Sequence, residues 1–307
     1  MPTTRGILFK VLALFLFSIM ASLIKASAPH VPPWQAVFFR SFFAMPIILI
    51  WLAQRHELKT GLKTKNPLGH FWRGLIGTSA MSMGFAALGI LPLPEVTAIG
   101  FAAPLFTVLL AAVLLGETVR VFRLTALAIG LLGVGIIIAP RLTLIELGGV
   151  EAVMLLGVML ALGSAFLRAL AQIHVRRLVQ SEETAAIVFY FSLTATCMSL
   201  ATIPLGWVMP TPQEFLFLIS AGLIGGVAQI FLTTGYRYAQ ASTLAPFDYV
   251  SMLFALLIGY FVFSEIPTAA TLLGSAIVIA AGILIIYRER QLGLVRGKAR
   301  PNVTPQG

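Results

Sequence analysis

The chain has 307 residues, of which 59% are hydrophobic and only 10% are charged. Soluble globular domains contain about 45–50% apolar and about 25% charged residues, so this composition excludes that class. The net charge is +10, with 21 basic and 11 acidic residues. Because the basic residues fall between long apolar runs, we interpret the charge as membrane orientation and not as a nucleic-acid surface.

Apolar windows bounded by charges, prolines or turn residues predict ten membrane-spanning helices. The first five are expected at residues 6–26, 34–53, 71–91, 95–115 and 121–139. The second five are expected at residues 150–171, 185–204, 214–236, 242–263 and 269–287. The short connections leave no room for a separate soluble domain. The predicted fold class is an all-α polytopic membrane protein.

The first apolar run has a second interpretation, a secretory signal peptide. Arg5 and Lys10 lie near its start, and Ala26-Ser27-Ala28 resembles an A-x-A cleavage site. Cleavage would leave nine helices and remove one member of the repeat described below. We therefore favour a spanning helix.

The distribution of basic residues distinguishes the cytoplasmic side of the predicted bundle from the outer side. With the N-terminus in the cytoplasm, seventeen lysines and arginines fall in internal segments, and the outer loops carry one, Arg141. The positive-inside rule therefore predicts a membrane protein with both termini in the cytoplasm. Residues 289–307 are expected to form a basic cytoplasmic tail.

The two halves of the chain resemble each other at a shift of about 147 residues. Val37-Phe38-Phe39 aligns with Ile187-Val188-Phe189, and Leu115-Gly116-Glu117 aligns with Phe263-Ser264-Glu265. The repeats are expected at residues 6–141 and 149–288. Each holds five helices, and five is odd, so the second copy must cross the membrane in the opposite sense.

An inverted repeat is typical of carriers, because two similar halves of opposite orientation can open a central site first to one side and then to the other. It places Glu117 on the inner side and Glu265 on the outer side. Gene duplication in a membrane protein of another role is the alternative.

Polar and aromatic residues at i, i+3/i+4 spacing predict which helix faces line a central cavity. The last helix of each half has few such residues and is expected to be peripheral. For each hydroxyl, the alternative is a hydrogen bond within its own helix. The candidate cavity residues are Ser18, Ser22, Arg40, Ser82, Phe85, Thr97, Phe101, Ser164, Gln229, Thr233, Tyr236, Asp248, Tyr249 and Ser251.

Charges inside the predicted spans are costly, at least about 2.5–3.5 kcal/mol each on insertion scales. Asp248 is the only aspartate in the chain. Three roles are open for it: proton coupling, pairing with a cationic substrate group, and neutralisation of Arg40. Arg40 is a candidate for substrate contact or for internal pairing. Lys25 and Arg168 lie nearer helix ends, where a long side chain is expected to reach the interface.

Other chemistry has little support in the sequence. The four histidines show no metal-ligand spacing, and no phosphate-binding or hydrolase motif is complete, so we expect no metal, no cofactor and no enzyme activity. The single Cys197 is expected to be a small core residue. Pro104 and Pro246 are predicted to interrupt the fourth helix of each half, and Gly222 with Gly226 to permit close helix packing.

These residues resemble the drug/metabolite transporter superfamily in its duplicated, ten-helix EamA form. The resemblance covers about residues 6–288. It rests on Ala36-Val37-Phe38-Phe39-Arg40, Pro104-Leu105-Phe106-Thr107 with Leu115-Gly116-Glu117, and Ala245-Pro246 with Ser264-Glu265. The second copy departs from the family's Gly-Glu pair, because Ser264 replaces the glycine.

The resemblance implies a secondary carrier whose cavity is formed mainly by its first, third, fourth, sixth, eighth and ninth helices. Within the family, the chain looks similar to proteobacterial members assigned to uptake of S-adenosylmethionine or riboflavin, which implies the bacterial inner membrane. Asp248 would suit a cation, and the aromatic residues would suit a planar ring. We expect a small-molecule substrate, a lipid bilayer and no nucleic acid as partners. The oligomeric state is left open, and the alternatives are amino-acid or metabolite export and a non-transporting ligand sensor.

Overall fold

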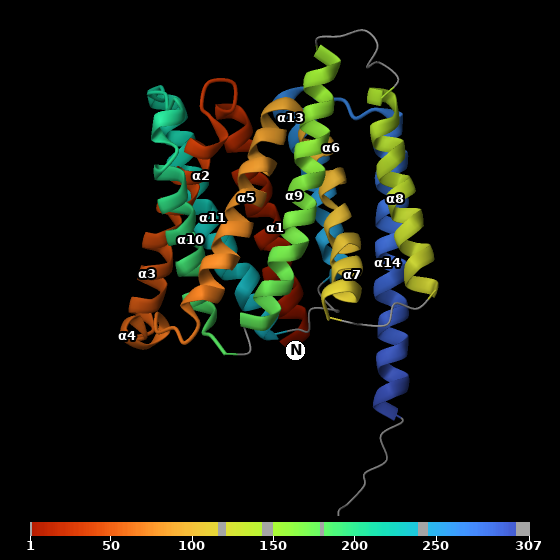
Figure 1. The fold of residues 1–307 in the computed structure, drawn as a ribbon, viewed down its shortest axis with the longest axis horizontal. Helices are drawn as coiled ribbons and strands as arrows, with labels where there is room; N and C mark the ends of the chain where they lie inside the picture. Colours follow the sequence, from red (N-terminus) through yellow and green to blue (C-terminus); the bar gives the residue numbers. More distant parts are fainter. Residues whose placement is uncertain (1, 116–120, 143–149, 179–180, 239–244, 299–307) are drawn as a thin grey trace, which may run out of the picture.

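The structure is a computed structural model that describes residues 2–115, 121–142, 150–178, 181–238 and 245–298, and within these ranges every regular element is a helix (Figure 1). The first half contains α1 (Pro2–Ser27), α2 (Pro33–Phe42), α3 (Ala44–Gln54), α4 (Leu58–Gly61), α5 (Pro67–Ile90), α6 (Leu93–Gly100), α7 (Ala102–Leu115) and α8 (Val121–Leu142). The second contains α9 (Val150–Leu178), α10 (Thr184–Leu200), the 3-10 turn η2 (Ile203–Leu205), α11 (Pro212–Tyr238), the 3-10 turn η3 (Ala245–Tyr249), α13 (Val250–Phe263) and α14 (Ala269–Lys298).

Each predicted range falls on one helix or on two consecutive elements. Four described helices are long and apolar enough to cross a membrane: Thr4–Ser27, Pro33–Gln54, Ala152–Val175 and Pro212–Leu232. Several shorter apolar helices accompany them. The predicted all-helical membrane fold is confirmed, and the number of crossings stays a prediction.

Two predicted helices are broken three residues before a proline. The second divides at Phe43 into α2 and α3, ahead of Pro46, and the fourth divides at Phe101 into α6 and α7, ahead of Pro104. A proline has no N–H to give to the carbonyl four residues earlier, so the hydrogen-bond ladder fails at that point. In the ninth predicted helix, the first described element is η3, which holds Pro246.

The two halves run in opposite directions and interleave. In Figure 1, α1 begins and α14 ends at the same end of the bundle, whereas α9 starts at the other end. The most extensive packing joins the halves: α1 lies along α11, α5 along α9, and α8 along α14. In repeat order, α1 corresponds to α9 and α5 corresponds to α11. The first two pairs are therefore equivalent to each other, as a two-fold relation between the halves requires. The α8 and α14 pair forms one edge of the bundle (Figure 1).

Gly222 and Gly226 permit the predicted close packing of α11. A Cβ at Gly222 would lie 2.8 Å from the carbonyl oxygen of Phe39, and one at Gly226 would lie 3.0 Å from Ile47. The prediction for Cys197 is wrong, because this residue is exposed on α10. In a membrane protein the lipid-facing surface is as apolar as the core, so an apolar neighbourhood in the sequence does not indicate burial.

Ser264 closes α13 in a left-handed conformation, with φ of 55°. The turn lets the Glu265 N–H donate to the Gly259 carbonyl oxygen at 2.8 Å. This conformation is unfavourable for a residue with a Cβ and suits glycine. The glycine of the first copy, Gly116, lies outside the described residues.

Glu182, in the connection between α9 and α10, binds the connection that precedes α5. Its side chain is 1% exposed; Oε1 accepts the N–H groups of Lys65 and Asn66 at 2.8 Å each, and Oε2 lies 3.3 Å from His70 Nε2. Burial by itself raises the pKa of Glu182. The hydrogen bonds from the Lys65 N–H and its neighbours outweigh that effect, and the net pKa is lowered.

We predict that Ser264→Gly stabilises the protein by about 0.5–1 kcal/mol, because glycine adopts this backbone conformation without a Cβ clash. Thermal unfolding of the detergent-purified protein measures the effect. Ser79→Gly, inside α5, is the matched control and is expected to destabilise by a similar amount. A lower melting temperature for Ser264→Gly would contradict the strained-turn interpretation.

We predict that Glu182→Gln destabilises the protein by about 1–3 kcal/mol at neutral pH, because the bound N–H groups lose a charged acceptor. Since the folded-state pKa is lowered, this contribution is complete above the ordinary carboxyl pKa of about 4.3 and disappears as the pH falls through the folded value. Unfolding at pH 7 and at successively lower pH tests it. Glu183→Gln, at an exposed neighbour, is the control. A stability gap between wild type and Glu182→Gln that does not shrink in acid would be evidence against this role.

Candidate functional site

Lys25, at the end of α1, is held by both halves of the chain. Its Nζ donates to the carbonyl oxygens of Leu88 at 3.1 Å and Leu91 at 2.7 Å, and it lies 3.0 Å from Glu265 Oε1. Glu265 Oε2 accepts the Leu93 N–H at 2.8 Å. The Lys25 and Glu265 side chains are 13% and 16% exposed. The predicted extension of Lys25 to the interface is therefore wrong, because an internal partner meets its charge.

A second ion pair lies toward the other end of α1. Lys10 Nζ is 2.6 Å from Asp248 Oδ1, and the two side chains are 4% and 41% exposed. Asp248 belongs to η3, and the Ser251 hydroxyl donates to its backbone carbonyl at 2.6 Å. Of the roles considered for Asp248, neutralisation of Arg40 is not what the structure shows, because Lys10 is its partner. The carboxylate stays accessible.

The interrupted fourth helices of the two halves meet through aromatic rings. Phe101, at the break between α6 and α7, contacts Tyr249, the last residue of η3, with centroids 5.1 Å apart. Both residues are buried. A cation lies beside this contact, because Arg168 approaches Gly100 and its Nη2 donates to the Ser164 hydroxyl at 3.2 Å. Ser164 in turn donates to the Ala80 carbonyl at 2.7 Å.

Two arginines share one aromatic ring between α2, α5 and α10. The guanidinium carbons of Arg40 and Arg73 lie 5.6 Å and 4.3 Å from the centre of the Phe191 ring. Arg40 is 6% exposed. Its Nε, and the Nε and Nη1 of Arg73, are buried without a hydrogen-bond partner.

Sequence reasoning did not place Arg73 in the cavity and counted it among the seventeen basic residues of the cytoplasmic side. In the structure it belongs to α5 and reaches inward. The available signal was Gly77, four residues later on the same helix face, which leaves room for a long side chain to lie along the helix.

Three of the predicted hydroxyls are bonded within their own helices. Ser18, Ser22 and Thr97 donate to the carbonyl oxygens of Leu14, Ile19 and Leu93 at 2.7–2.9 Å. This matches the alternative considered for them. Ser82 and Gln229 are half-buried on α5 and α11. Thr233 and Tyr236 lie on α11, but their side chains fall outside the described residues.

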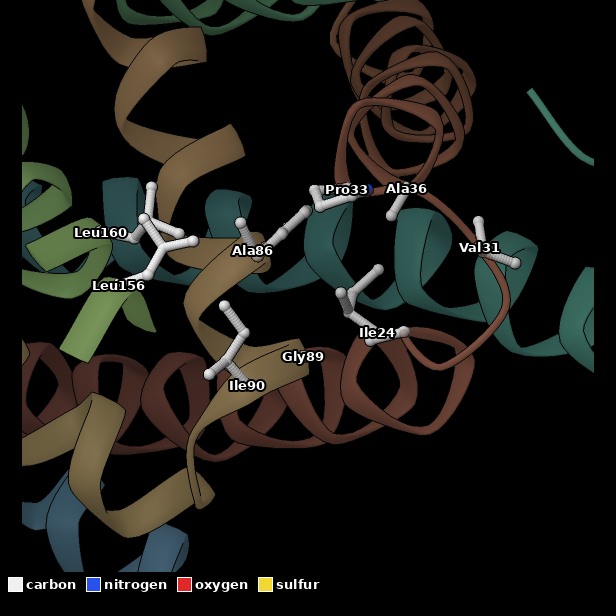
Figure 2. A pocket seen from close by; sticks show the side chains of 11 residues that line it. Ile24, Val31, Pro33, Ala36, Ala86, Gly89, Ile90, Leu156 and Leu160 are labelled. Atoms are coloured by element: carbon white, nitrogen blue, oxygen red, sulfur yellow. The ribbon is translucent and has the colours of Figure 1, made fainter. Parts of the chain in front are cut away.

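A pocket of about 310 Å³ lies between α1, α2, α5 and α9 (Figure 2). Its walls are apolar and include Ile24, Val31, Ile90, Leu156 and Leu160 (Figure 2). Phe85 is the one predicted cavity residue that lines it. No charged side chain lines this pocket. The ion pairs and the arginines are therefore the candidate site for a charged solute. Within the described ranges, no cluster of three metal-binding side chains is found.

The sequence matches the EamA-like transporter family at residues 4–139 and 155–288. It is 27% identical to the S-adenosylmethionine uptake transporter of Rickettsia prowazekii over 94% of each chain. It is also 30% identical to the pseudopaline exporter CntI of Pseudomonas aeruginosa, over 91% of this chain and 95% of that protein.

A solved crystal structure has the same fold, with a TM-score of 0.65 and 20% identity, covering 92% of this chain and 96% of the other. The family match takes in both halves and includes α1, whose two lysines bind the second half of the bundle. An apolar helical bundle with relatives of nearly full length that are named transporters is an integral membrane transport protein. The chain belongs to the EamA-like transporter family.

Proposed function

We propose that this transporter takes up S-adenosylmethionine, or a compound of the same charge pattern, across the bacterial inner membrane. The observation that carries the proposal is the set of Rickettsia relatives named S-adenosylmethionine uptake transporters, which are 27–28% identical over at least 90% of this chain. Riboflavin, the other candidate from the sequence, has no positive charge for Asp248 to attract. S-adenosylmethionine offers a sulfonium and an ammonium group.

The two ion pairs of α1 are the proposed barriers of an alternating-access cycle. Lys10 and Lys25 lie fifteen residues apart, about 22 Å along the helix. Each pairs with a carboxylate of the second half, Asp248 or Glu265. Separation of one pair while the other holds would admit solute from one side only, which is what alternating access requires.

Asp248 is the proposed binding residue both for a cationic group of the substrate and for a coupling proton. Its carboxylate is 41% exposed and its partner Lys10 is buried, so the pair can be approached from the Asp248 side only. A cationic group or a proton that reaches Asp248 competes with Lys10 for the same charge. Binding at this residue would therefore weaken one barrier directly.

Export is the second candidate direction, and the similarity to the pseudopaline exporter favours it. With both termini placed in the cytoplasm, as the basic residues predict, vesicles of opposite orientation separate the two directions. A non-transporting sensor would bind solute in both kinds of vesicle and exchange it in neither.

We predict that proteoliposomes loaded with unlabelled S-adenosylmethionine take up the labelled compound by counterflow, whereas riboflavin and amino acids give no exchange above protein-free liposomes. Net accumulation in right-side-out and not in inside-out vesicles would establish uptake. Exchange of an amino acid or of riboflavin, with none of S-adenosylmethionine, would overturn the proposed substrate. Accumulation in inside-out vesicles would assign export.

We predict that Asp248→Asn abolishes accumulation driven by a proton gradient, because the amide cannot carry a proton across. Counterflow, which needs no net proton movement, is expected to persist in the variant. The double variant Lys10→Met with Asp248→Asn removes the buried unpaired lysine and so controls for a folding defect. Gradient-driven accumulation that is unchanged in both variants would rule out coupling through Asp248.

A further inference from the structure

We propose that Arg40 and Arg73, on either side of Phe191, form a binding site for an oxyanion, namely the carboxylate group of the transported molecule. The inference rests on the proposed function, because it names the chemical group of the cargo that this part of the protein recognises.

The site lies where several helices converge. Arg40 comes from α2, Arg73 from α5 and Phe191 from α10, and these three helices pack against one another. The Nε of Arg40 is 3.6 Å from where a Cβ of Gly225 would stand, so α11 borders the site as well. The two cations therefore lie among helices of both halves.

The guanidinium groups have no anionic partner in the described part of the chain. The described ion pairs engage Glu57, Glu182, Glu214, Asp248 and Glu265 with other cations or histidines, and none lies within 4.0 Å of Arg40 or Arg73. Two like charges near one ring also repel each other. An arginine charge held in an apolar interior requires a counter-charge, and a bound oxyanion would supply it.

The Phe191 ring does not satisfy the hydrogen-bonding N–H groups of either guanidinium. A ring attracts a guanidinium through its face, whereas the N–H groups point outward in the guanidinium plane. The Nε of Arg40 and the Nε and Nη1 of Arg73 have no acceptor. Such donors match the two oxygens of a carboxylate.

Gly77 has no side chain, and the Arg73 guanidinium occupies the space that a side chain there would fill. A Cβ at this position would collide with Arg73 Nη1 and would come within 2.9 Å of Phe191 Cε2. The glycine thus provides a way to displace Arg73 without removing its charge. A methyl group at Gly135, on α8, would meet no neighbouring atom within 4 Å, so this glycine supplies the matched substitution.

The test is thermal unfolding of the full-length protein in phosphatidylcholine nanodiscs, with sodium acetate compared against sodium chloride at equal ionic strength. Acetate is expected to raise the melting temperature of the wild type and of Gly135→Ala. Arg40→Gln and Arg73→Gln are expected to melt higher than wild type without acetate, because an unpaired buried charge is gone, and to lose the acetate response. Gly77→Ala is expected to lose it too.

The result that overturns the site is an acetate response of equal size in wild type, Arg40→Gln and Arg73→Gln, or no response in wild type. A second arm adds phosphatidylglycerol to the nanodiscs. Stabilisation by this lipid that the arginine variants lose, without any acetate effect, would assign the arginines to a lipid phosphate and overturn their role in cargo binding.

A third arm relates the site to the cargo. Wild type is expected to bind S-adenosylmethionine about tenfold more tightly than its decarboxylated analogue, and Arg73→Gln is expected to bind the two equally. Equal affinities in wild type would contradict the carboxylate assignment. If wild type binds neither compound, the proposed function fails, and the acetate arm still decides whether the arginines bind an oxyanion.

Discussion

Lys25 carries the interaction on which one whole end of the bundle depends. Its ammonium group reaches the last carbonyls of α5 and the Glu265 carboxylate, and Glu265 holds the first N–H of α6. A helix end in an apolar medium has carbonyl and N–H groups that water cannot satisfy. One lysine and one glutamate satisfy them at the joint between α5 and α6. They also fix α1 against the end of α13, and in this way the first half of the chain is joined to the second.

The breaks in the helices give the rest of the interior its shape. Prolines interrupt the hydrogen-bond ladder at Phe43 and Phe101, and each interruption divides an apolar run into two consecutive helical segments. At Phe101 the break meets Tyr249, the end of η3 in the other half. A contact between equivalent interruptions lies on the axis that relates the repeats.

Hydropathy and repeat spacing predicted the helical ranges, the two similar halves and the paired interruptions, because each follows from local chemistry. Partners across the bundle did not follow. Asp248 stood out as the single aspartate, but Lys10 was counted with the loop charges although it is buried inside α1. Arg73 was missed for the same reason. Cys197 was assigned to the core because lipid and core favour the same residues. The surroundings of these four residues depend on the direction in which their side chains point from the helix. That direction is decided by packing between segments distant in sequence.

The continuity of α1 has a mechanical consequence. The structure describes it as one helix from Pro2 to Ser27, and the first proline after its start lies beyond its far end. A rod without a hinge cannot release Lys10 and Lys25 independently: tilting about its middle moves the two lysines in opposite directions. The helix would then act as a lever, and separation of one ion pair would press the other together. In the proposed alternating-access cycle, such coupling would prevent a leak, because a state with both ends open would require α1 to bend.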